Sequence, residues 1–161
     1  MSAAEKILLL VEDDPVVAEL VLHLLGQWHP PGRTVHVHDG VEALDFLHRR
    51  GAHEARDPGL PATVVLDLKM PRLDGLEVLR HMRSEPALRY IPVVMLTSSH
   101  DERDVQSSYE LGANAYVVKP VEFSRLTEVL RTLEIFWMEV NQPPPQPQDL
   151  PPELAGRSGP A

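Results

Sequence analysis

The strongest constraint on the fold is a regular alternation of short apolar runs with longer stretches of helical periodicity. Five runs are predicted to be strands, at residues 7–11, 34–38, 63–66, 93–96 and 115–118. Apolar residues recur at helical spacing after each run, and the last helical stretch extends from residue 121 to about 140. Strict alternation requires parallel strands, because a parallel pair is joined by a helical crossover. The sequence therefore predicts an α/β fold: a doubly wound five-stranded parallel sheet with an extended C-terminal helix.

Proline marks a boundary near the end of the chain. Seven of the 16 Pro residues lie in residues 143–161. Such a segment can neither extend a helix nor pair in a sheet, and it has little apolar surface to bury. We therefore expect a folded domain over residues 5–141 and a disordered tail over residues 142–161, which could also serve as a ligand for a Pro-binding groove.

Composition excludes several classes of function. The 161 residues include no Cys, which rules out a disulfide scaffold and cysteine zinc sites. A net charge of −9 argues against a nucleic-acid partner, because phosphates are bound by clustered Lys and Arg. The apolar run at residues 7–11 is too short to cross a membrane, and residues 1–6 lack a signal-peptide pattern. We expect a cytoplasmic protein that binds neither nucleic acid nor membrane.

Reactive side chains follow four of the predicted strands. Sites in parallel sheets lie outside the carboxyl ends of the strands. There the sequence places Glu12, Asp13, Asp67, Thr97 and Lys119. Three carboxylates held together raise one another's pKa values, and a divalent cation relieves the conflict. Oxygen ligands without His or Cys favour Mg²⁺.

The same set suits the chemistry of a phosphoryl group. Asp67 is placed to act as a nucleophile, because carboxylates can carry a phosphoryl group as an acyl phosphate. Thr97 could donate a hydrogen bond to a phosphoryl oxygen, and Lys119 could neutralise another. Taken singly, Glu12 and Asp13 could belong to an acidic turn that caps a helix, Asp67 could be a turn former, and Lys119 could be a solvated side chain. Their common position at strand ends favours a site.

Four segments resemble the receiver domains of bacterial two-component response regulators. They are ILLLVEDDP at residues 7–15, VVLDLKMPRLDG at 64–75, VVMLTS at 93–98 and ANAYVVKP at 113–120. The resemblance covers residues 5–135. It implies the strand order 2-1-3-4-5 of flavodoxin and the chemotaxis receivers.

The resemblance also implies roles for the residues at the strand ends. Asp67 would be the phosphoacceptor, and Glu12 and Asp13 would form the acidic pair, with Asp13 binding Mg²⁺ more directly. The backbone carbonyl of Lys69 would complete the protein's share of the metal ligands. Asp67 would itself be a metal ligand.

Two further positions complete the implied site. Thr97 and Lys119 would contact the phosphoryl group, with a cis bond between Lys119 and Pro120. Tyr116 lies where the family places its switching aromatic. Movement of Thr97 toward the phosphoryl group would turn that ring inward and change the face made by the fourth helix, fifth strand and fifth helix. Alternatively, Tyr116 is a half-buried strand aromatic without that role.

The end of the final helix carries more apolar surface than one core face requires. Phe136 and Trp137 lie in an Ile-Phe-Trp-Met run, and such contiguous apolar surface usually marks an interface. Together with the long loop at residues 51–61, this extension resembles single-domain regulators that partner phytochrome-type histidine kinases. It implies a homodimer through the final helix. In the alternative, both rings fold back onto their own domain.

The sequence thus predicts a phosphoacceptor response regulator that assists its own phosphorylation and dephosphorylation, with a sensor histidine kinase as partner. One alternative is an Asp-nucleophile phosphatase of the haloacid dehalogenase type. Lys69 occupies the position where those enzymes carry a second Asp, which argues against it. Another is a pseudo-receiver that only scaffolds. His36 and His38 could form a metal pair, but a solvent-facing strand pair is favoured.

Overall fold

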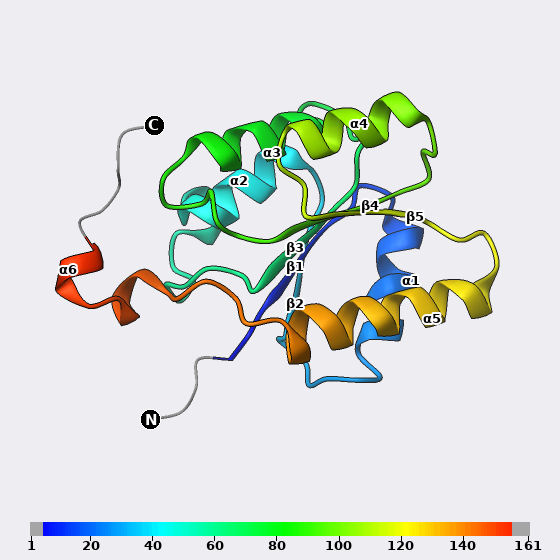
Figure 1. The fold of residues 1–161 in the computed structure, drawn as a ribbon. Helices are drawn as coiled ribbons and strands as arrows, with labels where there is room; N and C mark the ends of the chain where they lie inside the picture. The colour runs from blue at the N-terminus through cyan, green and yellow to red at the C-terminus, as the bar shows by residue number, and fades with distance from the viewer. Residues whose placement is uncertain (1–4, 156–161) are drawn as a thin grey trace.

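The computed structural model describes residues 5–155 as a central sheet covered by helices on both faces (Figure 1). The strands are β1 (Leu8–Val11), β2 (Thr34–Val37), β3 (Thr63–Leu66), β4 (Val93–Thr97) and β5 (Ala115–Val118). All neighbouring strands pair in parallel, in the order β2-β1-β3-β4-β5. The predicted fold class and strand order are confirmed.

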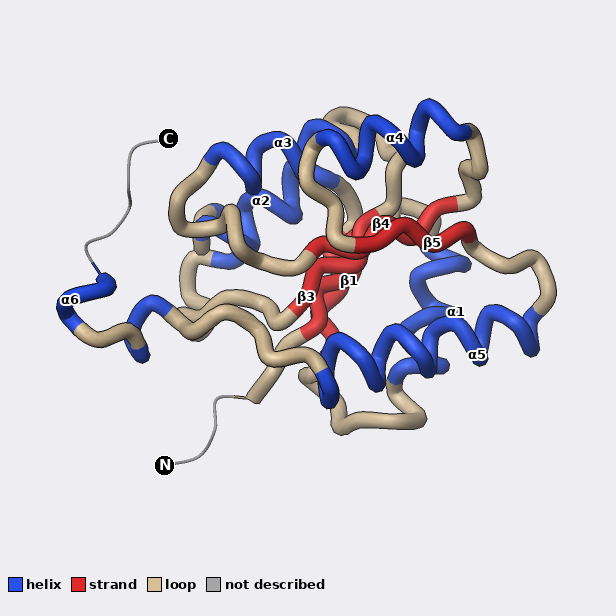
Figure 2. The backbone as a smooth tube through the Cα atoms, in the orientation of Figure 1, coloured by secondary structure: helices blue, strands red, loops and turns tan. Residues whose placement is uncertain are grey.

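The helices divide into two layers around the sheet. Helices α1 (Pro15–Leu25) and α5 (Phe123–Glu134) cover one face, and α2 (Gly40–His48), α3 (Gly75–Ser84) and α4 (Glu102–Glu110) cover the other (Figures 1 and 2). Side chains alternate between the two layers along a strand. Leu9 and Val11 therefore join the core under α2 and α3, while Leu8 and Leu10 join the core under α1 and α5. Burial on both sides explains why β1, β3 and β4 read as continuous apolar runs.

Four helices begin at an Asp that caps their free backbone N–H groups. These residues are Asp14, Asp39, Asp74 and Asp101. A carboxylate at this position accepts hydrogen bonds from the first helical turn and favourably meets the positive end of the helix dipole. Each of these helices follows a strand after a short connection. The caps therefore help to fix the connections at the carboxyl edge of the sheet.

The final helix changes its winding before it ends. The sequence predicts helix to about residue 140, and the chain does stay helical to Val140, but Ile135–Val140, which follow α5, form a π-helix. Met138 is buried, and its carbonyl accepts a hydrogen bond from the Lys6 ammonium at 3.2 Å. The wider turn therefore joins the end of the final helix to the segment that leads into β1.

The Pro-rich segment, for which composition predicts disorder, makes defined contacts with the domain. The Gln146 side chain makes two hydrogen bonds to Leu60, from its Nε2 to the Leu60 carbonyl (3.0 Å) and from the Leu60 N–H to its Oε1 (2.7 Å). A 3₁₀ turn (Pro147–Asp149) and a short helix α6 (Pro152–Ala155) follow. The Gln146 side-chain amide thus supplies a hydrogen-bond donor, which proline backbones lack, and an acceptor. Residues 156–161 of the predicted tail lie outside the described part.

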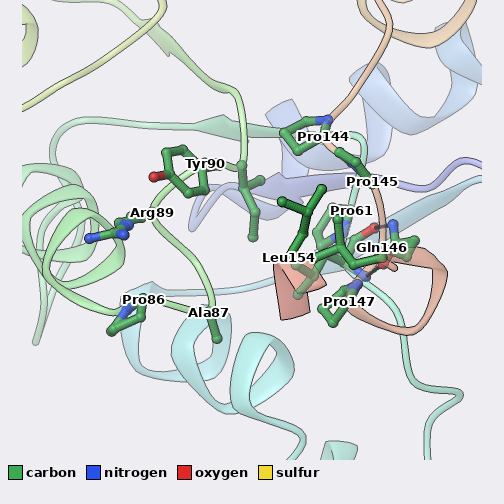
Figure 3. A pocket seen from close by; sticks show the side chains of 13 residues that line it. Pro61, Pro86, Ala87, Arg89, Tyr90, Pro144, Pro145, Gln146, Pro147 and Leu154 are labelled. Atoms are coloured by element: carbon green, nitrogen blue, oxygen red, sulfur yellow. Dashed lines mark hydrogen bonds between the residues drawn. The ribbon is translucent and has the colours of Figure 1, made fainter. Parts of the chain in front are cut away.

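Residues 142–155 run beside the loop before β3 and the loop before β4. Together these segments line an apolar cavity of about 390 Å³, with Pro61, Tyr90 and Leu154 among its walls (Figure 3). Leu60 and Ile91 also line it. The long loop at residues 51–61 includes a 3₁₀ turn (Gly51–His53). Within residues 5–155, no helix combines the length and apolar character needed to cross a bilayer.

Candidate functional site

Three carboxylates meet at the carboxyl edge of the sheet. Each of Glu12, Asp13 and Asp67 offers an oxygen within 4.8 Å of the others. The strands position them directly, because the Glu12 N–H donates to the Val37 carbonyl and the Asp67 N–H donates to the Val11 carbonyl. These bonds extend the strand pairing by one residue beyond β1 and β3. The backbone of Glu12 and of Asp67 is therefore held by the hydrogen bonding of the sheet.

The Lys119 ammonium lies between two of these carboxylates. Its Nζ is 2.5 Å from Glu12 Oε1 and 3.1 Å from Asp67 Oδ2. Burial lowers the pKa of Lys119, but the hydrogen bond to Glu12 and the negative charges of Asp67 and Glu12 outweigh burial, so its pKa is raised. Lys119 is thus held charged beside Asp67, where it can neutralise an added anion.

The peptide bond that follows Lys119 corrects one expectation. The family resemblance implies a cis bond between Lys119 and Pro120, but the described residues contain no cis peptide bond. The trans form is favoured for an X–Pro bond by about 0.5–1 kcal/mol. With the bond trans, the Lys119 N–H still donates to the Thr97 carbonyl at 2.8 Å and the ammonium reaches both carboxylates.

Glu12 is the most deeply buried member of the acidic cluster. It is 2% exposed, and its Oε2 is buried without a hydrogen-bond partner in the described part of the chain. Burial, followed by the neighbouring Asp67, raises the pKa of Glu12 to about 7 in spite of Lys119. An unpaired carboxylate oxygen within a cluster of hard oxygen donors is the environment that a divalent cation stabilises. The residues present therefore fit the predicted metal.

The loop after Asp67 depends on a close approach by Gly75. Asp67 Oδ1 accepts a hydrogen bond from the Leu68 N–H at 2.7 Å, and the Gly75 N–H donates to the Leu68 carbonyl at 2.7 Å. A Cβ at residue 75 would lie 2.2 Å from the Asp67 carbonyl oxygen. Gly75 thus lets the start of α3 close against the residue that carries the central carboxylate. Lys69 lies on the same loop with its side chain 76% exposed.

A chain of hydrogen bonds runs from Thr97 through the loop after β4 to Tyr116. Thr97 is 2% exposed, and its Oγ1 accepts a hydrogen bond from the Ser99 N–H at 3.3 Å. The Tyr116 hydroxyl donates to the Ser99 carbonyl at 2.9 Å, and its ring packs against the core. Burial raises the pKa of Tyr116. Thr97 and Tyr116 are therefore connected through one residue.

The sequence matches the response regulator receiver domain family over residues 8–131. This chain belongs to that family. The Rcp1 response regulator of Synechocystis sp. is 38% identical over 134 residues, which cover 83% of this chain and 90% of that protein. The chain is thus a response regulator receiver domain, and it spans most of the length of Rcp1.

Solved structures of related receiver domains have the same fold. The phosphorylated cyanobacterial phytochrome response regulator RcpA has a TM-score of 0.81 at 35% identity, covering 88% of this chain and 100% of RcpA. The Mn²⁺-bound form of Rcp1 has a TM-score of 0.79 at 37% identity, covering 87% of this chain and 99% of Rcp1. The bacteriophytochrome response regulator RtBRR has a TM-score of 0.69 at 52% identity, covering 88% of this chain and 85% of RtBRR.

The remaining predicted residues contribute no side chain to the acidic cluster of the receiver domain. Phe136 is 46% exposed, and its ring meets Trp137 edge-to-face with centroids 4.8 Å apart. His36 Nε2 lies 2.9 Å from the Glu12 carbonyl oxygen, and its ring contacts His38. Across residues 5–155, Glu12, Asp13 and Asp67 form the one group of three or more metal-ligating side chains.

One contact at the site was not anticipated from the sequence. The Ser99 hydroxyl donates to Asp104, which lies in the first turn of α4. In the sequence, an acidic residue in the first turn of a helix indicates only a favourable interaction with the helix dipole. The one indication of a contact with Ser99 is that Asp104 follows the end of β4 closely in sequence. Asp104 also lines the hollow in front of the acidic cluster, together with Asp13 and Lys69.

Proposed function

We propose that Asp67 accepts a phosphoryl group from the phosphohistidine of a sensor histidine kinase. The observation that carries the proposal is the gathering of Glu12, Asp13, Asp67 and Lys119 at one edge of the sheet. An Asp67 carboxylate oxygen would attack phosphorus, and the phosphorus–nitrogen bond of the donor would break with its electron pair going to the imidazole. The product is an acyl phosphate on Asp67.

The residues around Asp67 have distinct roles in this transfer. The Lys119 ammonium, 3.1 Å from Asp67 Oδ2, would neutralise a phosphoryl oxygen. The Thr97 hydroxyl, which accepts from Ser99, retains its own hydrogen for donation to another oxygen. Both groups lie on strand ends, so they are positioned before the phosphoryl group arrives.

Mg²⁺ would be held by Glu12, Asp13, Asp67 and the backbone carbonyl of Lys69, with Asp13 the more direct acidic ligand. When bound, the cation offsets the charge of the phosphoryl oxygens during transfer. Support comes from the unpartnered Glu12 Oε2 and the all-oxygen donor set. The related Rcp1 structure with Mn²⁺ shows that a receiver of this kind takes a divalent metal.

Phosphorylation would be read out by a change of the face that α4, β5 and α5 form. Movement of Thr97 toward the phosphoryl group would pull on Ser99, whose carbonyl holds the Tyr116 hydroxyl. Tyr116 would then change its packing. The chain therefore acts as a phosphoacceptor whose product is its own modified state, and the same residues would assist hydrolysis of the acyl phosphate.

The cognate kinase is proposed to be of the phytochrome type, because related structures are described as phytochrome and bacteriophytochrome response regulators. A homodimer through the end of α5 is also proposed. Its support is the exposure of Phe136 (46%) and Val140 (65%) on the turn that carries Trp137. Apolar residues exposed together favour association.

The test is phosphotransfer from an autophosphorylated phytochrome-type kinase in the presence of Mg²⁺. Wild type should acquire the labelled phosphoryl group, and Asp67→Asn should not. Asp14→Asn is the matched control, because Asp14 is a neighbouring acid whose capping role Asn can keep. EDTA should abolish transfer to the wild type and the control alike. Equal labelling of wild type and Asp67→Asn would refute Asp67 as the acceptor.

A further inference from the structure

Asp104 joins two loops at the mouth of the site. Its Oδ2 accepts a hydrogen bond from Ser99 Oγ at 2.5 Å and lies 3.9 Å from the Lys69 ammonium. The Asp104 side chain is 24% exposed, and it lines the hollow in front of the acidic cluster. One carboxylate of α4 therefore contacts both the loop after β4 and the loop after β3.

Ser99 is held from several directions at once. Its N–H donates to Thr97 Oγ1, its carbonyl accepts from the Tyr116 hydroxyl, and its own hydroxyl donates to Asp104. The hydroxyl oxygen also accepts from the Asp101 N–H at 3.3 Å. Of these bonds, the one to Asp104 involves a charged partner and is therefore the strongest. A displacement of Ser99 away from Asp104 has to break this bond.

Lys69 gives Asp104 a second connection to the acceptor. An exposed ion pair at 3.9 Å is weak, so the Lys69 ammonium can leave Asp104 at little cost. A phosphoryl group on Asp67, two residues away in sequence, would add negative charge that competes for the same ammonium. Asp104 thus holds Ser99 by a strong hydrogen bond, whereas its contact with Lys69 contributes little.

We propose that Asp104 is a positioning residue that holds the loop between β4 and α4 in its unphosphorylated arrangement and thereby limits how readily Asp67 is phosphorylated. The inference rests on the proposed phosphoacceptor function. Loss of a hydrogen bond to a charged group that exists in one of two states shifts their ratio by about tenfold or more. Asp104→Ala should therefore speed phosphorylation about tenfold.

The experiment measures the rate at which phosphoramidate and Mg²⁺ phosphorylate the full chain, followed on phosphate-affinity gels. Asp104→Ala and Ser99→Ala should each react about tenfold faster than wild type, and the double variant no faster than either single one. Asp104→Asn, which retains an acceptor for the Ser99 hydroxyl, should stay within about threefold of wild type. Glu102→Ala is the matched control, because Glu102 is an exposed acid in the same turn.

The outcomes separate this inference from the function on which it rests. If wild type is phosphorylated on Asp67 but Asp104→Ala reacts at the wild-type rate, the positioning role is wrong and the acceptor role stands. Independent, multiplying effects of Asp104→Ala and Ser99→Ala would also overturn it, as would equal acceleration by Glu102→Ala. If wild type takes no phosphoryl group on Asp67, both proposals fail. Urea midpoints of all variants show whether a rate change reflects unfolding, and the Asn and Ser99 variants decide the question should Asp104→Ala not fold.

Discussion

The burial of Glu12 predicts an unusual dependence of stability on pH. Its pKa is raised from an ordinary value of 4.5 to about 7 by burial and by Asp67. Between these values, the folded protein binds a proton that the unfolded chain has released. The free energy of unfolding of the metal-free protein should therefore fall as pH rises through this window, because the folded state must ionise a carboxyl group that burial disfavours.

The size of the effect follows from the same shift. Each pH unit within the window changes the free energy of unfolding by about 1.4 kcal/mol. Between about pH 5.5 and the Glu12 pKa of about 7 lie roughly 1.5 pH units, so the free energy of unfolding should fall by about 2 kcal/mol by pH 8. The chain also contains eight His residues, so the contribution of Glu12 has to be isolated by a variant that cannot ionise at residue 12.

Urea unfolding in EDTA, followed by circular dichroism at several pH values, would measure this dependence in wild type and in Glu12→Gln. The difference between their free energies of unfolding should change by about 2 kcal/mol across the window, with wild type losing more stability toward pH 8. Mg²⁺ should restore wild type at high pH, where Glu12 is ionised, and have less effect on Glu12→Gln. Parallel curves for the two proteins would refute the argument.

Three further substitutions test other parts of the fold. Gly75→Ala should lower the phosphorylation rate at least tenfold and destabilise the fold by about 1–3 kcal/mol, as measured on phosphate-affinity gels and in urea, because its Cβ would meet the Asp67 carbonyl. Gln146→Ala should remove two hydrogen bonds and cost about 1–2 kcal/mol, with faster hydrogen exchange at the Leu60 amide as the readout; unchanged exchange would contradict the docking of the tail. Trp137→Ala should reduce the dimer fraction on size-exclusion chromatography, and an unaltered dimer would exclude this turn as the interface.

Much of the architecture could be predicted because its signals are local. Apolar runs that end abruptly in a charged or hydroxyl side chain, as at Leu66–Asp67 and Leu96–Thr97, mark both the buried strands and the edge at which they end. Parallel topology then brings their polar neighbours together. The order of the strands was therefore enough to predict that Asp67 and Lys119 lie close together.

The features that escaped prediction depend on single pairings between distant polar groups. Asp104 has the composition of an ordinary helix start, and its contact with Ser99 depends on the path of one loop. Gln146 lies in a segment whose prolines predict disorder, and its partner Leu60 is 86 residues away. Neither pairing leaves a periodic trace in the sequence. The π-helix at Ile135–Val140 could not be predicted either, because the spacing of apolar residues does not distinguish it from an α-helix.

The amide of Gln146 has a consequence for where a shortened version of this protein could be cut. A chain truncated at the change in composition near residue 142 would leave the N–H and carbonyl of Leu60 without their partner. It would also uncover apolar side chains, including Ile91, that now face Pro144–Leu154. A shortened chain that keeps these contacts therefore has to include the residues after Val140 as far as Leu154. Composition alone would assign that sequence to a dispensable linker.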